Sequence, residues 1–207
     1  MADFLILKAN LPNYTKKDID LGNILQDLYS LCSIIRECFC LSYSIRKDTR
    51  LYLHFIDSKL TIKLEGKKLK YLGSDERSQA LLLYKAISKK IESFSPKWEQ
   101  STPGIYIMVH TRDLNVFDLI LKETNEEVIF VLDEKCTEKS KNIEEINTPN
   151  QKLYILPSNA IDIEIHEIEN IFKKLNKQLI FVSLPKIKSI ENKVLYINFK
   201  IDQKENL

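Results

Sequence analysis

Two hydroxyl side chains and a glycine come together at Ser101-Thr102-Pro103-Gly104, directly before an apolar segment at residues 105–109. Proline fixes φ and lacks an N–H, while glycine accepts φ > 0, so the tetrapeptide predicts a tight turn. The hydroxyls of Ser101 and Thr102 leave donors and acceptors at the entrance of the next strand. The segment therefore predicts either a structural turn or a site that handles RNA or a cofactor.

Other side chains exclude several kinds of chemistry. The four cysteines form no C-x-x-C pair and three fall in one apolar stretch, so we interpret them as small core residues. His54, His110 and His166 are far apart in the sequence, and we expect no metal. The four glycines form neither a Walker loop nor a dinucleotide-binding loop, and no nucleophile elbow supports a Ser-His-Asp hydrolase.

The composition is that of a globular chain. Its 207 residues are 44% hydrophobic, which is enough for one domain with its own core. The net charge is only +2, so any nucleic-acid surface must be a local patch. The first residues show no basic stretch that leads into a long apolar run, and no later run approaches the roughly 18 apolar residues of a membrane span. We expect a cytoplasmic protein without a membrane partner.

Short apolar runs alternate with segments of helical spacing, which predicts a parallel sheet with helices on both faces. Strands are expected at residues 4–8, 51–56, 60–64, 105–109, 128–132, 153–156 and 179–182. Helices are expected at residues 18–40, after a cap at Ser74, at 116–121 and at 165–175.

Three segments need separate interpretation. A turn at residues 65–68 leads into residues 69–72, which predicts a hairpin insertion over about residues 51–72. The polar residues 136–151 predict a surface loop. The chain end is ambiguous, because Ser189 could cap a helix while residues 195–201 also alternate like a strand.

Four segments occur in the order and spacing of one family. They are residues 4–10 (FLILKAN), 41–48 (LSYSIRKD), 74–78 (SDERS) and 98–106 (WEQSTPGIY). Together they cover about the first half of the chain, and they resemble the archaeal tRNA pseudouridine-54 N1-methyltransferases of the SPOUT superfamily. Four separated matches are far more specific than any one of them.

The resemblance implies a single SPOUT-like domain over residues 1–207. Its fold would be α/β, with a mostly parallel six-stranded sheet, helices on both faces and a C-terminal deep trefoil knot over about residues 128–207. Such a protein would be a homodimer that binds S-adenosylmethionine in the knot and methylates N1 of a pseudouridine in the T loop of tRNA. That chemistry needs an in-line approach of the nitrogen, removal of its proton and extrusion of the base.

On the RNA side, the resemblance singles out a basic loop that contains an acid. Arginine there would hold phosphate, and Asp48 could orient or accept the N1 proton as the candidate catalytic residue. Without the resemblance, the same cluster would be interpreted as surface ion pairs. Arg77 could contact RNA or a second subunit. The expected RNA-binding residues are Arg46, Lys47, Arg50, Arg77, Ser101 and Thr102.

On the cofactor side, the chain departs from the family pattern. The family has a glycine-rich turn where this chain has Pro157-Ser158-Asn159-Ala160, and Pro157 offers no N–H to a ligand. A second cofactor segment aligns with residues 180–185. The expected cofactor-binding residues are Leu132, Pro157, Ser158, Val182, Ser183, Leu184, Pro185 and Asn192.

Three functional classes follow from these observations. The first is a tRNA methyltransferase that uses S-adenosylmethionine. The second is a catalytically inactive relative that binds tRNA or ribosomal RNA without methylating it. The third is a protein-interaction module on the same fold. Titration with S-adenosylmethionine separates the first two, and a steep salt dependence of tRNA binding excludes the third.

Overall fold

The chain folds around one mixed β-sheet. The structure is a computed structural model, and it describes residues 2–89, 97–110, 116–124, 128–132, 140–143, 152–158, 170, 172–174 and 176–205. The described strands are β1 (Ala2–Lys8), β2 (Arg50–Phe55), β3 (Leu60–Glu65), β4 (Glu99–Thr102), β5 (Ile105–Val109), β6 (Val128–Leu132), β7 (Lys141–Asn142), β8 (Lys152–Pro157) and β9 (Gln178–Ser183). The described helices are α1 (Lys16–Asp20), α2 (Gln26–Phe39), α3 (Glu76–Ile87), α4 (Val116–Thr124) and α6 (Ile190–Glu205).

The sheet consists of a parallel part and an antiparallel part. Its strand order is β4-β5-β3-β2-β1-β8-β6-β9-β7. Neighbouring strands from β2 to β7 in this order pair in parallel, whereas β2–β3, β3–β5 and β5–β4 pair in antiparallel fashion. Because β1, β2, β6, β8 and β9 run in the same direction, their carboxyl ends lie at one end of the sheet and their amino ends at the other.

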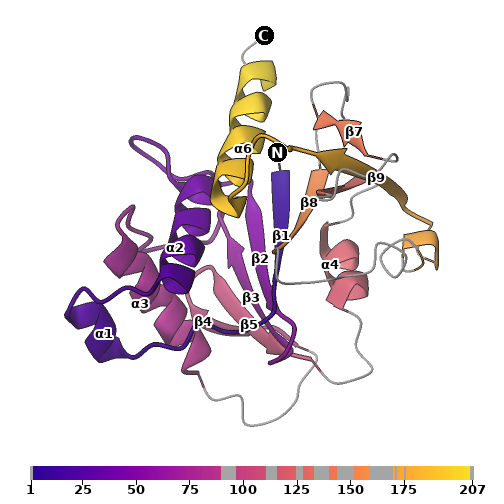
Figure 1. Ribbon diagram of the computed structural model, residues 1–207. Helices are drawn as coiled ribbons and strands as arrows, with labels where there is room; N and C mark the ends of the chain where they lie inside the picture. The colour runs from indigo at the N-terminus through magenta and orange to yellow at the C-terminus, as the bar shows by residue number, and fades with distance from the viewer. Residues whose placement is uncertain are drawn as a thin grey trace.

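Alternate residues of the strands face opposite sides and build two cores. On one side, Phe4 and Ile6 pack with buried residues of α1, α2, α3 and α6. On the other side, Leu5 and Leu7 pack with Val116 and further buried residues of α4. Figure 1 shows the four helices on one face and α4 on the other. Helices on both faces, as expected from the sequence, are therefore confirmed.

The expected single helix at residues 18–40 is wrong, because the chain forms two helices. In α1, Thr15 accepts from the Asp18 N–H, and the Asp18 carboxylate accepts from the Thr15 N–H in return. Gly22 then adopts φ 74°, which an α-helix cannot continue through. After this break α2 begins at Gln26, so the break turns the chain before the longer helix.

The expected count of six strands is also wrong, since the described sheet has nine. Residues 99–102 are polar and give no alternating signal, yet they pair with β5 as β4. Lys141 and Asn142 lie in the segment expected to be a loop, yet they pair with Val182 and Ser183 as β7. Both strands owe their formation to a neighbouring strand and not to their own side chains.

Several element boundaries can be compared with those expected from the sequence. Asp75, not Ser74, caps α3, because its carboxylate accepts from the Ser78 N–H at 2.9 Å. Residues 69–72 do not form a strand, although the antiparallel hairpin of β2 and β3 is confirmed. The ambiguous chain end is a helix, and Ser189 Oγ accepts from the Asn192 N–H at its start.

Parts of the C-terminal half fall outside the described residues. Of the helix expected at residues 165–175, only residue 170 and residues 172–174 are described, and they are helical. The segments that follow β6 and β8, on which a knot would depend, lie outside the described residues. No helix within the described segments is long and apolar enough to cross a bilayer.

Candidate functional site

Three of the expected cofactor segments meet at the carboxyl ends of adjacent strands, a location we call the strand-end site. β6 lies between β8 and β9, and Leu132 at its end pairs with Val182. Pro157 ends β8, and residues 183–185 follow directly after Val182. In open α/β sheets, ligands bind outside the carboxyl ends of strands, so this is a suitable place for a cofactor.

The strand-end site has an apolar floor with more accessible residues around it. Leu132 is 2% exposed and Val182 is fully buried. Ser183 and Leu184 are half-buried, and Pro185 is exposed. The arrangement offers apolar contact and strand-end backbone groups, which suit the adenosine portion of a nucleoside ligand.

Two other expected cofactor residues are committed to local structure. The Ser158 N–H donates to the Leu7 carbonyl at 3.0 Å, so it extends the β1–β8 pairing and is not directed to a ligand. Asn192 lies exposed in the first turn of α6, where its N–H donates to Ser189 Oγ at 3.4 Å. The Ser158 N–H is therefore engaged within the sheet, unlike the N–H of a glycine-rich turn that is exposed to a ligand.

The other end of the sheet carries three loops, which we call the basic end. They are residues 41–49 before β2, residues 66–75 after β3, and Pro103-Gly104 between β4 and β5. The Gly66 N–H donates to the Thr49 carbonyl at 2.9 Å, and the Lys70 N–H donates to the Pro103 carbonyl at 3.3 Å. The three loops are thus hydrogen-bonded to one another.

Glycine is required at both contacts between these loops. Gly104 has φ 81°, and a Cβ there would lie 2.5 Å from Leu69 Cα. A Cβ on Gly66 would lie 2.9 Å from the Thr49 carbonyl oxygen and would also meet the Arg46 and Lys47 carbonyls. The turn at Ser101–Gly104 is therefore structural, and it also lies beside the expected RNA-binding loop.

The arginines of the basic loop have intramolecular partners. Arg46 forms a two-pronged ion pair with Asp202 of α6, with N–O distances of 2.6 and 2.5 Å, and this pairing lowers the pKa of Asp202. Arg50 binds Asp3, which is 1% exposed, and donates to the Glu123 carbonyl at 3.0 Å. Burial raises the pKa of Asp3, and Arg50 opposes that effect.

The remaining expected RNA-binding residues differ in their placement. Lys47 and the candidate base Asp48 are exposed on the loop before β2. Ser101 is half-buried, and the Thr102 hydroxyl is buried without a partner among the described residues. Arg77 lies on α3 and pairs with Asp20 of α1 at 3.0 Å. The structure thus brings all of them except Arg77 to the basic end.

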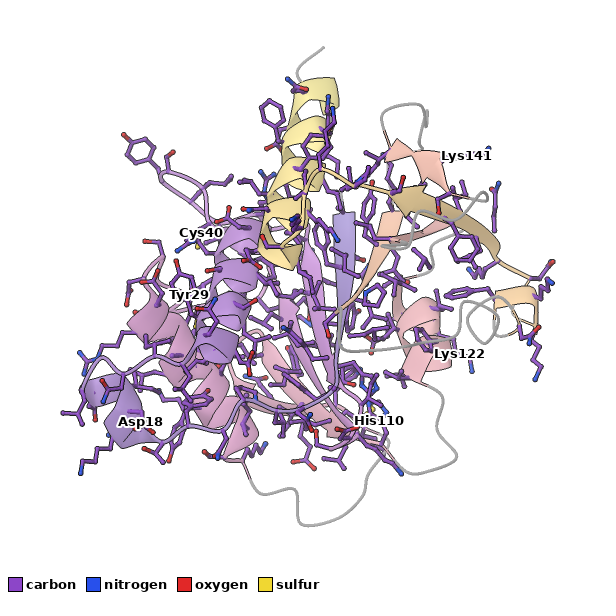
Figure 2. The ribbon with its side chains drawn as sticks, in the orientation of Figure 1. Asp18, Tyr29, Cys40, His110, Lys122 and Lys141 are labelled. Carbon is purple, nitrogen blue, oxygen red and sulfur yellow. The ribbon has the colours of Figure 1, made fainter. Side chains whose placement is uncertain are left out.

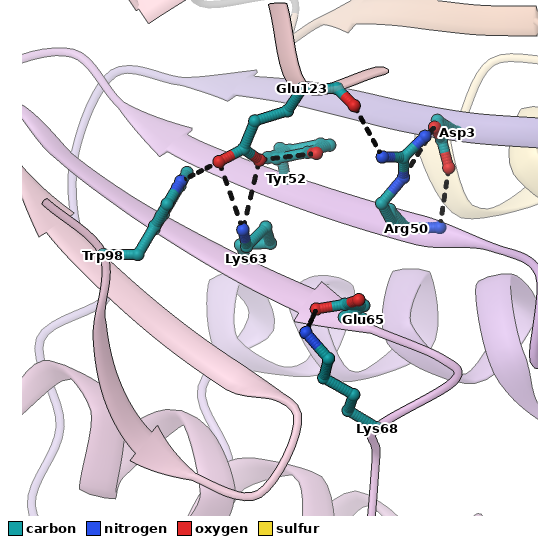
Figure 3. Close-up of polar contacts among 8 residues, drawn as sticks. All are labelled: Asp3, Arg50, Tyr52, Lys63, Glu65, Lys68, Trp98 and Glu123. Atoms are coloured by element: carbon teal, nitrogen blue, oxygen red, sulfur yellow. Dashed lines mark hydrogen bonds and ion pairs between the residues drawn. The ribbon is translucent and has the colours of Figure 1, made fainter. Parts of the chain in front are cut away.

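A carboxylate that the sequence did not single out joins several elements near the basic end. Glu123 at the end of α4 accepts from Trp98 Nε1, from Tyr52 Oη at 3.1 Å and from Lys63 Nζ at 3.1 Å (Figure 3). Lys63 Nζ also lies 4.3 Å from the centre of the Trp98 ring. These contacts join residues far apart in the chain, so no local pattern could have revealed them.

Two histidines that looked isolated in sequence are joined in the structure. Thr61 Oγ1 lies 2.9 Å from His54 Nδ1 and 2.5 Å from His110 Nε2. Burial lowers the pKa of His54 to about 4 and also lowers the pKa of His110. Figure 2 shows His110 and Cys40 at opposite ends of the fold. Because Cys40 directly precedes the basic-end loop at residues 41–49, the histidines lie away from the basic end.

The two cysteines of the core are not suited to nucleophilic chemistry. Cys32 and Cys38 are buried in the core, as expected, and burial raises the pKa of the Cys32 thiol to about 12. Within the described segments, no group of three or more His, Cys, Asp or Glu residues is placed to hold a metal ion.

The strand-end site and Asp48 lie at opposite ends of the sheet within one chain. Strand pairing aligns Arg50 with Asp3, and Pro157 with Leu7. Four residues of strand separate these two levels, which corresponds to about 13 Å at roughly 3.3 Å per residue. Asp48 precedes Arg50 and lies beyond that level. One chain therefore does not bring Asp48 to its own strand-end site.

Comparisons with known proteins agree with the sequence resemblance. Residues 1–205 match a family model described as a putative SAM-dependent RNA methyltransferase. The chain is 32% identical over 175 residues to a tRNA (pseudouridine(54)-N(1))-methyltransferase from Methanocaldococcus jannaschii, covering 80% of this chain and 71% of that protein. It is 32% identical over 160 residues to the Thermococcus kodakarensis protein of the same name, covering 73% and 76%. The Haloferax volcanii protein of that name is 30% identical over 145 residues, covering 70% and 68%. The chain therefore belongs to the family of SAM-dependent RNA methyltransferases that includes the archaeal tRNA (pseudouridine(54)-N(1))-methyltransferases.

Proposed function

We propose that the protein methylates N1 of pseudouridine at position 54 in the T loop of tRNA, with S-adenosylmethionine as methyl donor. The observation that carries this proposal is the meeting of Leu132, Pro157 and residues 182–185 at one end of the sheet, in a chain of this family. The proposal extends to a single domain over residues 1–207 with a knotted C-terminal portion, acting in the cytoplasm.

The chain's own residues would divide the work between binding and proton transfer. Leu132 and Val182 would form the apolar floor beneath the adenosine, and Ser183 and Leu184 would border it. S-adenosylmethionine, when bound, supplies an electrophilic methyl group on a sulfonium. Asp48 would accept the N1 proton as N1 forms its bond to the methyl carbon, so that no positive charge remains on N1. Lys47 beside it would contact the neighbouring phosphate.

The distance between Asp48 and the strand-end site implies a second subunit. Since these groups lie at opposite ends of one chain, the partner's basic end must face this chain's strand-end site for the proton acceptor to reach the base. The surface over α2 and α6 is suited to dimer formation. Tyr29 is 41% exposed, Leu195 is 48% exposed and Phe199 is 52% exposed, and their helices lie side by side through the Ser30–Glu191 and Asn198–Glu37 contacts (Figure 2).

The activity is tested directly with purified protein, methyl-labelled S-adenosylmethionine and tRNA. We expect one methyl group per tRNA that carries pseudouridine at position 54, identified as N1-methylpseudouridine by mass spectrometry. The matched control is the same tRNA with uridine at that position, which should remain unlabelled. Equal labelling of both tRNAs would contradict the site assignment, and absence of labelling would contradict the enzyme.

The proposed dimer surface is tested by sedimentation. Phe199→Asp should convert a dimer into a monomer, because the charge would be buried in the interface. Leu21→Asp is the matched control, since Leu21 is 62% exposed on the loop after α1 and away from the surface over α2 and α6. A wild-type monomer at micromolar concentration would contradict the proposal.

A catalytically inactive RNA-binding relative is the second candidate, and one observation favours it. β8 ends at Pro157, which has no N–H, and is followed by Ser158, whose N–H already donates to the Leu7 carbonyl. Calorimetric titration separates the two candidates. Saturable binding of S-adenosylmethionine supports the enzyme, whereas no heat at millimolar cofactor leaves only the RNA-binding relative.

A further inference from the structure

The loop after β3 carries an exposed aromatic ring in an uncommon backbone conformation. Tyr71 has φ 65° and its side chain is 80% exposed. A bulky residue rarely adopts the left-handed region, because its Cβ then approaches the neighbouring carbonyl. Such a conformation persists where the surrounding structure fixes the backbone, and it is found most often at functional sites. The ring contributes little to the core, so its placement needs another explanation.

The backbone around Tyr71 is fixed by its neighbours on the basic end. Leu69 is 4% exposed and packs where Gly104 makes its close approach. The Leu69 N–H donates to the Glu65 carbonyl at 3.0 Å, and the Lys70 N–H donates to the Pro103 carbonyl at 3.3 Å. The loop therefore holds Tyr71 outward on a rigid support, which reduces the entropy lost when the ring binds a ligand.

Three lysines precede Tyr71 in the same loop. Lys67, Lys68 and Lys70 are exposed, and no acidic residue occurs between Gly66 and Tyr71. Lys68 pairs with Glu65 at 3.0 Å (Figure 3), whereas Lys67 and Lys70 have no ion pair among the described residues. The loop therefore presents, within the described part of the chain, two uncompensated positive charges beside an exposed ring.

The loop is continuous with the expected RNA-binding loop. Gly66, at its start, donates to Thr49 and packs against the carbonyls of Arg46 and Lys47. Lys47 is exposed there, with one acid, Asp48, beside it. Lysines that contact phosphates next to an aromatic ring that stacks on a base are the usual elements of a surface for unpaired RNA.

We propose that the loop at residues 67–71 is an RNA-contact surface in which Tyr71 stacks on an unpaired base and Lys67 and Lys70 contact flanking phosphates. This inference rests on the proposed function, since it supplies a place for bases adjoining the one that is methylated. Flipping a base from a loop leaves its neighbours unstacked, and an exposed ring compensates for the lost stacking.

The ring is tested by comparing three forms in a fluorescence-anisotropy titration with tRNA. Tyr71→Phe keeps the stacking surface and should bind tRNA within about twofold of wild type. Tyr71→Asn removes the ring and tolerates the left-handed backbone, so it should bind at least about 5-fold more weakly. Equal affinity of Tyr71→Asn and wild type would overturn the inference.

The lysines are tested by the salt dependence of the same binding. The double variant Lys67→Gln/Lys70→Gln should lower the slope of log affinity against log salt by about 1.5 to 2, because two phosphate contacts are lost. The matched control is Lys16→Gln/Lys17→Gln on α1, which removes the same charge from another surface and should leave the slope unchanged. Equal slopes for the two double variants would overturn the inference.

These outcomes remain distinguishable from failure of the proposed function. If wild type methylates tRNA and the Tyr71 and lysine variants bind as well as wild type, the loop is not a contact surface although the enzyme stands. If wild type binds no tRNA, the proposed function fails and the loop assignment fails with it. Circular dichroism and S-adenosylmethionine titration of each variant establish that the fold and the strand-end site are intact.

Discussion

Arg46 and Asp202 form an ion pair with two hydrogen bonds, 2.6 and 2.5 Å long, that joins the loop before β2 to the C-terminal part of α6. The two residues are 156 positions apart in the chain. Their side chains are 20% and 39% exposed, so solvent screens the pair only in part. The first and last portions of the fold are therefore joined at the basic end, where the candidate base Asp48 lies two residues after Arg46.

Asp202→Asn should lower the free energy of unfolding by about 1 kcal/mol, as expected for a partly exposed bidentate pair. Arg46→Gln should have an effect of the same size, and the double variant should be no less stable than either single variant. Urea denaturation of the four proteins gives the coupling energy. Strictly additive losses would show that the pair does not act as a unit.

Gly66→Ala should displace the loop that carries Lys47 and Asp48. Its new methyl group would overlap the carbonyls of Arg46 and Thr49, which are backbone atoms, so the loop must move. We expect a loss of about 1 to 3 kcal/mol in stability together with weaker tRNA binding. The measurements are urea denaturation and a tRNA titration.

Gly22→Ala is the control for Gly66→Ala. Gly22 has φ 74°, but a Cβ at this position would have no neighbouring atom within 4 Å, so alanine there costs only backbone strain, about 1 kcal/mol. Its tRNA affinity should match that of wild type. A Gly66→Ala protein that binds tRNA normally would show that the loop conformation does not matter for RNA.

Glu123→Gln should weaken three contacts at once, because the neutral amide offers a single acceptor oxygen to Trp98, Tyr52 and Lys63. We expect a loss of about 2 to 3 kcal/mol, against about 1 kcal/mol for Tyr52→Phe, which removes one hydrogen bond. Trp98 is the only tryptophan, so its fluorescence reports the site directly. An unchanged emission spectrum in Glu123→Gln would contradict the assigned hydrogen bond.

Stability should fall as the pH is lowered through the range set by the buried histidines. The pKa of His54 is lowered from 6.5 to about 4, so the unfolded chain binds a proton in this interval that the folded chain does not. The contribution of His54 to the free energy of unfolding is complete above pH 6.5 and is lost progressively down to about pH 4, with an upper bound of about 3 kcal/mol. His110 acts in the same direction, because burial also lowers its pKa.

The histidine prediction is measured by urea denaturation at about pH 7.5, 6.5 and 5.5, which span the upper part of that interval. His54→Gln keeps a side chain able to bond Thr61 and should show a shallower loss of stability with falling pH than wild type. Identical pH dependence in the two proteins would assign the effect to other groups.

The sequence predicts those elements whose own side chains determine them. Apolar runs located β1, β5, β6, β8 and β9. A helix capped by Ser189 was one of the two alternatives expected for the chain end, and it is the one that forms. The polar β4 and the two-residue β7 could not be predicted, because pairing with a neighbouring strand forms them. Gly22 was a visible sign of the break in the first helix, but the apolar spacing on either side concealed it.

The candidate sites were predictable only as segments. Family motifs located the basic loop and the strand ends, while contacts such as Arg46–Asp202 and Tyr52–Glu123 depend on chain segments 156 and 71 residues apart. That Asp48 and the strand-end site lie at opposite ends of the sheet also follows only from the strand register.

Subunit complementation tests the central claim, that the strand-end site of one chain works with the basic end of another. Asp48→Asn and Ser183→Trp, which fills the strand-end site, should each be inactive as homodimers. After the two are unfolded and refolded together, half of the dimers should be mixed, and each of these should contain one intact site of two. We therefore expect about one quarter of wild-type methyl transfer to pseudouridine-54 tRNA. Mixed dimers that form but transfer no methyl groups would contradict the shared site.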